Sequence, residues 1–188
     1  MNDTKLERLF KGEYKILKYF LEEPDREVNL AIALKHVNMS KMTIYRILEK
    51  MEKMGVLKSR TDNYRRFYKL IDSPLIPVLK TLINLDSPII TDLLRDLKSK
   101  SHLIILYGSR ANGTNRSASD WDFLVVSDEL DSVILNQKVT KLEMKYDCQI
   151  NVKHYTTSEL IKIRSEKTPF YSEVMSNKYI LKGTLDET

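Results

Sequence analysis

A Gly-Ser pair and a pair of aspartates lie beside apolar runs in the second half of the chain. Gly108 and Ser109 follow the apolar run 103–107, and Asp120 and Asp122 come after an interval of ten residues. A glycine lets the backbone approach a bulky anion, and a serine hydroxyl adds a hydrogen-bond donor. Carboxylates two apart in a strand project to the same side and suit Mg²⁺. The pattern predicts a site for a phosphate group and a divalent cation.

The flanking segments are predicted to position these residues. The run 103–107 has the continuous apolar character of a buried strand, and residues 120–126 are predicted to form a second buried strand. If residues 109–113 open a helix, its free N–H groups point at the bound anion. If the two strands pair, the carboxylates lie beside that turn. Gly-Ser and Asp-x-Asp are each common alone, but together they predict the apparatus of phosphoryl or nucleotidyl transfer.

This segment resembles the DNA polymerase β-like nucleotidyltransferases, in particular the minimal nucleotidyltransferase domains. The resemblance covers about residues 87–183 and is carried by Gly108-Ser109, Ser119-Asp120-Trp121-Asp122 and the closing stretch 170–183. It implies a small mixed β-sheet flanked by helices. It also implies that a nucleoside triphosphate lies against Gly108 and Ser109, that Arg110 contacts a phosphate, and that the catalytic Asp120 and Asp122 hold Mg²⁺ or Mn²⁺.

One position departs from the pattern of active members, which carry a third carboxylate on a later strand. Here that strand is predicted at 149–153, where Asn151 takes the position. An asparagine carbonyl can coordinate a cation, but the amide cannot accept a proton at neutral pH. Asp147 shares its strand parity, yet it lies about 13 Å away along a strand. Whether catalysis survives Asn151 is left open by the sequence.

The first third of the chain is basic. Residues 1–70 hold 16 Lys and Arg against 10 Asp and Glu, whereas residues 71–188 hold 15 against 16. This skew favours a polyanionic partner for the first third, although a solvated basic face gives the same count. Apolar spacing predicts helices ending near Pro24, over 30–36 and from Ser40 to Gly55, then a hairpin of strands 56–60 and 64–70 with a turn at 61–63.

This order of elements resembles winged-helix transcriptional regulators. In that family the third helix enters the major groove of double-stranded DNA and the hairpin contacts the backbone. The DNA-binding positions implied by the resemblance are Ser40, Lys41, Thr43, Tyr45 and Arg46 in the helix, and Lys58, Arg60, Arg65 and Arg66 in the hairpin. The sequence thus predicts an α+β protein with an N-terminal winged helix-turn-helix and a C-terminal nucleotidyltransferase-like domain.

The predicted domains are a winged helix at 1–71, a helical connector at 72–99 and a nucleotidyltransferase-like domain at 100–188. The connector carries two apolar stripes, separated by Asp86-Ser87-Pro88. The first stripe is suited either to sealing the domains together or to pairing two copies. We expect a homodimer, since regulators of this class read paired half-sites.

The remaining composition narrows the class of protein. No apolar run approaches the length of a membrane span, and the N-terminus lacks the pattern of a signal peptide, so a cytoplasmic protein is expected. A single cysteine, Cys148, excludes an intrachain disulfide.

Three functions are compatible with these features. The first is a DNA-binding regulator whose second domain binds a nucleoside triphosphate and Mg²⁺. The second is an active nucleotidyltransferase that modifies a hydroxyl of a protein or nucleic acid. The resemblance includes some minimal nucleotidyltransferases that act as antitoxins, so an antitoxin role falls under this function. The third is a protein-interaction module. The absent third carboxylate places the regulator first.

Overall fold

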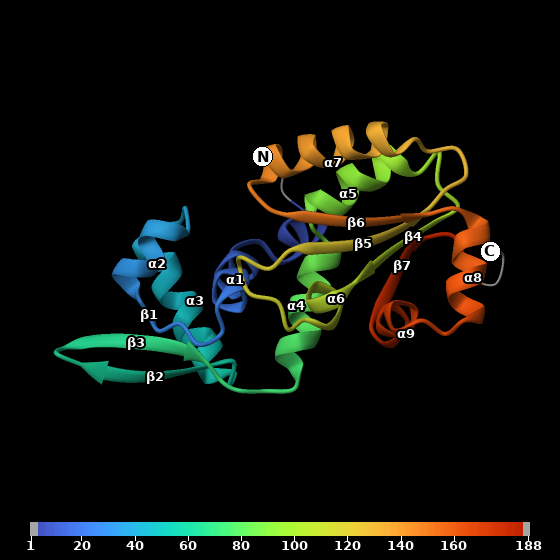
Figure 1. Ribbon diagram of the computed structural model, residues 1–188. Helices are drawn as coiled ribbons and strands as arrows, with labels where there is room; N and C mark the ends of the chain where they lie inside the picture. The colour runs from blue at the N-terminus through green and yellow to red at the C-terminus, as the bar shows by residue number, and fades with distance from the viewer. Residues whose placement is uncertain (1–3, 186–188) are drawn as a thin grey trace. The chain divides into compact units, whose positions relative to one another are not determined.

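The computed structural model describes residues 4–185 and divides the chain into two compact units (Figure 1). The first unit comprises Met1–Ile83 and the second Asn84–Thr188. The boundary falls within helix α4 (Leu75–Leu85), so the segment expected to be a connector is divided between the units. Each unit has its own buried core.

The first unit consists of helices followed by a hairpin. Its elements are α1 (Lys5–Glu22), β1 (Val28–Asn29), α2 (Leu30–His36), α3 (Lys41–Lys53), β2 (Leu57–Asp62) and β3 (Arg65–Leu70). The three strands form an antiparallel sheet in the order β1-β3-β2. Ser40 caps α3 as predicted, because its side chain accepts a hydrogen bond from the backbone N–H of Thr43.

The turn of the hairpin differs from the prediction by about two residues. Thr61 and Asp62 continue β2, and Asp62 pairs with Arg65, so the connecting loop is Asn63-Tyr64. Both loop residues have positive φ, 45° and 61°. A loop of two left-handed residues matches the twist of the strands it joins, and this favours the shorter loop over the predicted one.

The second unit is built on a mixed four-stranded sheet in the order β6-β5-β4-β7. Strand β4 (Leu103–Tyr107) pairs antiparallel with β5 (Trp121–Val126) and with β7 (Lys178–Lys182), and β6 (Ile150–Tyr155) is parallel to β5. The two buried strands expected from the sequence are therefore neighbours. A parallel neighbour needs a crossover, which α7 (Ser132–Tyr146) provides.

Helices cover the two faces of this sheet differently (Figure 1). Helices α5 (Pro88–Leu97) and α7 pack on the face formed by Phe123 and Val125. Helices α8 (Thr157–Ser165) and α9 (Pro169–Ser176) pack on the face formed by Leu124 and Val126. The short helix α6 (Gly108–Asn112) follows β4 directly. None of the described helices combines the length and the apolar character that crossing a membrane requires.

Candidate nucleotide and metal site

The Gly-Ser turn and the acidic pair lie side by side. Gly108 has φ +71°, and an added Cβ there would stand 2.6 Å from Oδ2 of Asp122. The adjacent residue, Tyr107, pairs with Asp122 across β4 and β5. Only glycine satisfies both the left-handed backbone and this close approach. The carboxylate of Asp122 therefore fills the space that a side chain at position 108 would need.

Asn151 lies against both carboxylates. It is the register partner of Asp122 across the parallel strands β5 and β6. Its amide nitrogen donates to Oδ2 of Asp120 at 3.2 Å and to Oδ1 of Asp122 at 3.1 Å. The strand predicted to carry the third carboxylate is thus in the expected place. From that position the amide of Asn151 donates a hydrogen bond to each aspartate. These two bonds reduce the repulsion between the two carboxylates.

These three side chains fit a divalent cation. Two carboxylates and an amide supply hard oxygen ligands, and Mg²⁺ is commonly bound through one or two carboxylates with substrate phosphates completing its shell. Asp120 and Asp122 would hold the ion, and Asn151 would turn its carbonyl oxygen toward it. A bound ion would neutralise phosphate charge and orient a triphosphate. Residues 4–185 contain no cluster of three or more His, Cys, Asp and Glu suited to a metal.

Tyr107 borders the acidic pair on the sheet face covered by α8 and α9. Its ring packs edge-on against Phe170, with centroids 5.8 Å apart. Burial, followed by the negative charges of Asp122 and Glu173, raises the pKa of Tyr107 to about 12. The phenol is therefore neutral at physiological pH. Tyr107 supplies an uncharged, apolar wall next to the carboxylates.

Arg110 contacts the backbone that enters strand β5. Its side chain is buried and donates to the backbone carbonyl of Ser119 at 3.1 and 2.5 Å, and to that of Asp120 at 3.1 Å. The guanidinium also lies 4.3 Å from the ring centroid of Trp121. These contacts hold the backbone that enters β5. Arg110 thus positions the acidic pair, and the phosphate contact implied by the resemblance stays a prediction.

Asn84 is a further positioning residue that the sequence did not indicate. Its buried amide nitrogen donates to the carbonyl of Arg110 and to Oδ1 of Asn115, both at 2.9 Å. These bonds fix the loop between α6 and β5 to the end of α4. The one sign of this role in the sequence is that Asn84 is a polar residue within a mostly apolar helical segment. Asp147, weighed as a substitute carboxylate, lies outside β6 as the left-handed cap of α7.

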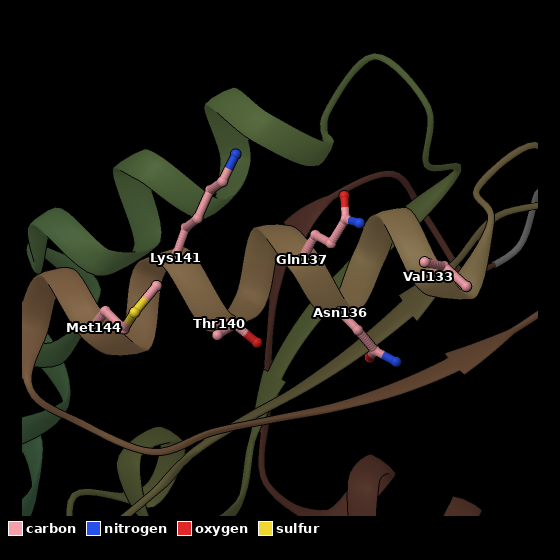
Figure 2. Close-up of a pocket in the computed structure, with 6 residues that line it drawn as sticks. All are labelled: Val133, Asn136, Gln137, Thr140, Lys141 and Met144. Atoms are coloured by element: carbon pink, nitrogen blue, oxygen red, sulfur yellow. The ribbon is translucent and has the colours of Figure 1, made fainter.

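A shallow hollow on the second unit lies away from this site. Figure 2 shows that helix α7 alone provides the residues that line it: Val133, Asn136, Gln137, Thr140, Lys141 and Met144. All six are exposed, while the buried residues of α7 pack on the sheet face opposite Asp122. The hollow therefore has no part in the chemistry of the acidic pair.

The residues predicted to bind DNA differ in their surroundings. Arg60 forms two hydrogen bonds with Glu27, at 2.8 and 2.6 Å, and Arg66 bonds Glu52 at 2.5 Å. Three others bond within α3 or at its start, since Ser40 contacts Thr43 and Tyr45 donates to Glu49.

Four of the predicted residues remain exposed and form no ion pair within residues 4–185: Lys41, Arg46, Lys58 and Arg65. These four are the positive charges of the set that can meet an outside anion without first losing a carboxylate partner. The hairpin contributes two of them and α3 the other two.

The sequence of the second unit matches a known protein family. The profile of the family described as polymerase beta, nucleotidyltransferase, matches residues 90–185. The chain belongs to this nucleotidyltransferase family. A comparison with curated proteins found no match.

Solved structures show general likenesses. A toxin-antitoxin structure with AMP-PNP is 24% identical, with TM-score 0.41, over 52% of this chain and 76% of that chain. A mutant of the toxin-antitoxin MntA-HpeT is 27% identical, with TM-score 0.40, over 52% and 73%. TrmBL2, an archaeal chromatin protein, is 12% identical, with TM-score 0.31, over 89% and 76%. The family assignment rests on the sequence match.

Proposed function

We propose that the second unit binds a nucleoside triphosphate with Mg²⁺ or Mn²⁺ and transfers its nucleoside monophosphate to a hydroxyl of a protein or nucleic acid, with release of pyrophosphate and of the hydroxyl proton. The observation that carries this proposal is the contact of Gly108 with Asp122, which puts a phosphate-binding turn beside an acidic pair. Membership of a nucleotidyltransferase family supports it. This order reverses the ranking suggested by the sequence, where the regulator came first.

The roles of the residues follow from their chemistry. Gly108 and Ser109 receive the triphosphate, and Asp120 and Asp122 hold the cation that neutralises it. Asn151 orients the two carboxylates but cannot take the proton of the attacking hydroxyl. The chain's own contribution to the rate is thus positioning and charge.

Labelling with a nucleoside triphosphate radioactive at the α-phosphate tests the proposal. The protein is incubated with cell lysate and Mg²⁺ or Mn²⁺, and transfer is followed on gels. Asp120→Ala and Asp122→Ala are expected to abolish the label, whereas Glu129→Ala, an exposed carboxylate of the same unit, leaves it unchanged. Labelling that persists in both aspartate variants would show that the acidic pair is not the site.

We also propose that the first unit is a winged helix that binds double-stranded DNA as a homodimer, as a transcription regulator does. The specific support is the set of four exposed, unpaired basic residues on α3 and the hairpin, within a segment of net charge +6. Each phosphate contact that is removed lowers the slope of log K against log salt by about 0.9.

Gel-shift titrations over a range of salt concentrations test the second proposal. Lys41→Ala and Arg46→Ala are expected to weaken binding and to reduce the salt dependence. Arg60→Gln serves as a comparison, since Glu27 already neutralises Arg60, and it should have the smaller effect. Binding that is absent at every salt concentration would refute a DNA-binding role, and mass measurement in solution checks the dimer.

A further inference from the structure

One row of residues crosses all four strands of the second unit's sheet (Figure 1). Asn151 is opposite Asp122, and Asp122 is opposite Tyr107. Tyr107 is in turn opposite Lys178, the first residue of β7. Residues directly opposite one another on neighbouring strands project to the same face. Neighbouring strands lie about 4.8 Å apart, so the backbone of Lys178 is about 10 Å from that of Asp122. The row therefore places a lysine on the face of the acidic pair, beside the strand that ends in the Gly-Ser turn.

Lys178 has no carboxylate partner among residues 4–185. Its ammonium nitrogen donates to the backbone carbonyl of Met175, in the last turn of α9, at 2.9 Å. An ammonium group has three donors, so two remain for an acceptor outside the described part of the chain. The side chain is half-buried, and burying a charge without a counter-charge costs free energy. Lys178 is thus suited to an anion that comes from outside the chain.

The surroundings of Lys178 indicate which anion this is. Helix α6, which begins at Gly108, contacts both β4 and β7, so the Gly-Ser turn and Lys178 are neighbours. A nucleoside triphosphate on that turn keeps negative charge after it binds one divalent cation. Arg110, the basic residue next to the turn, already donates to carbonyls of the loop that enters β5. A lysine is a compact charge that binds phosphate oxygens well.

We propose that Lys178 binds the triphosphate, and that its ammonium group moves from the carbonyl of Met175 to the phosphates that leave as pyrophosphate. The phosphorus that is transferred lies at the cation held by Asp120 and Asp122. The other phosphates then lie on the turn beside Lys178. This inference rests on the proposed transfer reaction and adds a residue to which neither the Gly-Ser and Asp-x-Asp pattern nor the resemblance gives a role.

Binding of a fluorescent ATP analogue with Mg²⁺ tests this inference in the full-length protein. Lys178→Gln removes the charge but keeps a donor for the carbonyl of Met175, and the affinity should fall about tenfold. Its affinity should also depend less on salt, since the lost contact is between charges. Lys178→Arg keeps the charge and should keep most of the affinity.

Lys182→Gln is the matched control. Lys182 also lies on β7 and also donates to backbone carbonyls, but it is opposite Ile104, whose side chain belongs to the other face of the sheet. Its loss should leave the affinity for the ATP analogue unchanged. Melting is followed by circular dichroism, and binding is measured well below the melting temperature of each variant, so that lost affinity does not reflect unfolded protein.

The outcomes distinguish this inference from the proposed function. If the natural protein binds no ATP analogue with Mg²⁺ or Mn²⁺, both are wrong. If it binds, and Lys178→Gln binds equally well, only the role of Lys178 is wrong and the acidic pair keeps its own. An equal loss in Lys178→Arg or in Lys182→Gln would also overturn the inference, because the effect would then not come from a positive charge on this face.

Discussion

Replacing Asn151 by aspartate tests the reasoning on the acidic site most directly. In the natural protein, the amide nitrogen of Asn151 lies 3.2 Å from an oxygen of Asp120 and 3.1 Å from an oxygen of Asp122. Asn151→Asp keeps the size of the side chain but replaces this donor by a negatively charged oxygen. Three carboxylates would then lie next to one another and repel. The folded variant should therefore need a bound cation to reach the stability of the natural protein.

The expected cost follows from these distances. Asn151 is exposed, so the dielectric constant of water applies, and two like charges about 3 Å apart then repel by about 1.3 kcal/mol for each pair. The two lost hydrogen bonds to charged groups add about 1 kcal/mol each at an exposed position. Movement of the side chains relieves part of this sum. We expect the free energy of unfolding without metal to fall by about 2–4 kcal/mol.

A divalent cation should reverse that loss. A ligand that binds only the folded state stabilises it by about 2.7 kcal/mol when present at a hundredfold excess over its dissociation constant. The third carboxylate raises the affinity for the ion, so Mn²⁺ should restore most of the stability of Asn151→Asp. The natural protein should respond less to Mn²⁺, since its two carboxylates are already joined by an amide.

Urea unfolding in EDTA and in Mn²⁺ measures both effects, and electron paramagnetic resonance counts the bound ion. Asn151→Ala is the matched control, since it removes the hydrogen bonds without adding a charge. It should lose about 1–2 kcal/mol and gain no dependence on metal. Equal stability of Asn151→Asp and the natural protein in EDTA, with no response to Mn²⁺, would show that position 151 does not face the acidic pair.

Three further predictions concern residues that support the same unit. Arg110→Ala removes a buried side chain, leaves the carbonyls of the half-buried Ser119 and Asp120 without this donor, and should lower the free energy of unfolding by about 2–4 kcal/mol, measured by urea titration. Gly108→Ala puts a methyl group 2.6 Å from a carboxylate oxygen and should abolish binding of a fluorescent ATP analogue. Burial acts to raise the pKa of Asp92, but hydrogen bonds from Lys145 and Tyr146 outweigh it and lower the pKa. The resulting stability is present above pH ~4 and lost as pH falls below it, and Asp92→Asn should flatten this part of the pH profile.

The elements that local pattern determines could be predicted from the sequence. The strand at 103–107 follows from a continuous apolar run, the strand at 121–126 follows from the apolar residues 123–126 at its end, and the cap at Ser40 follows from its place before an amphipathic stretch. The register of β6 was also predictable, because apolar residues on both sides of Asn151 set its parity. The contact of Asn151 with both aspartates depends on parallel pairing with β5, which the sequence supports only through the resemblance.

Contacts that join distant segments could not be predicted. Asn84 forms hydrogen bonds with Arg110 and Asn115, which lie 26 and 31 residues further along the chain. No local periodicity in the sequence indicates such bonds. The phosphate contact of Arg110 was implied by the resemblance and stays a prediction. Its bonds to the carbonyls of the loop that returns to β5 join segments about ten residues apart, and the sequence did not indicate them. The hairpin turn was misplaced because Tyr64 is a poor sequence signal for a left-handed position.

The substitution at Asn151 and the support given by Arg110 act on the same two carboxylates through different forces. Arg110 fixes the backbone from which they project, because its guanidinium donates hydrogen bonds to carbonyls of the loop. Asn151 contacts the carboxylates themselves and leaves them with a formal charge of −2, where a third aspartate would give −3. A site of −2 holds a cation less tightly, so more of the ion's binding must come from the phosphates that arrive with the nucleotide. Metal and triphosphate should therefore bind this chain together, each raising the affinity for the other by the same factor.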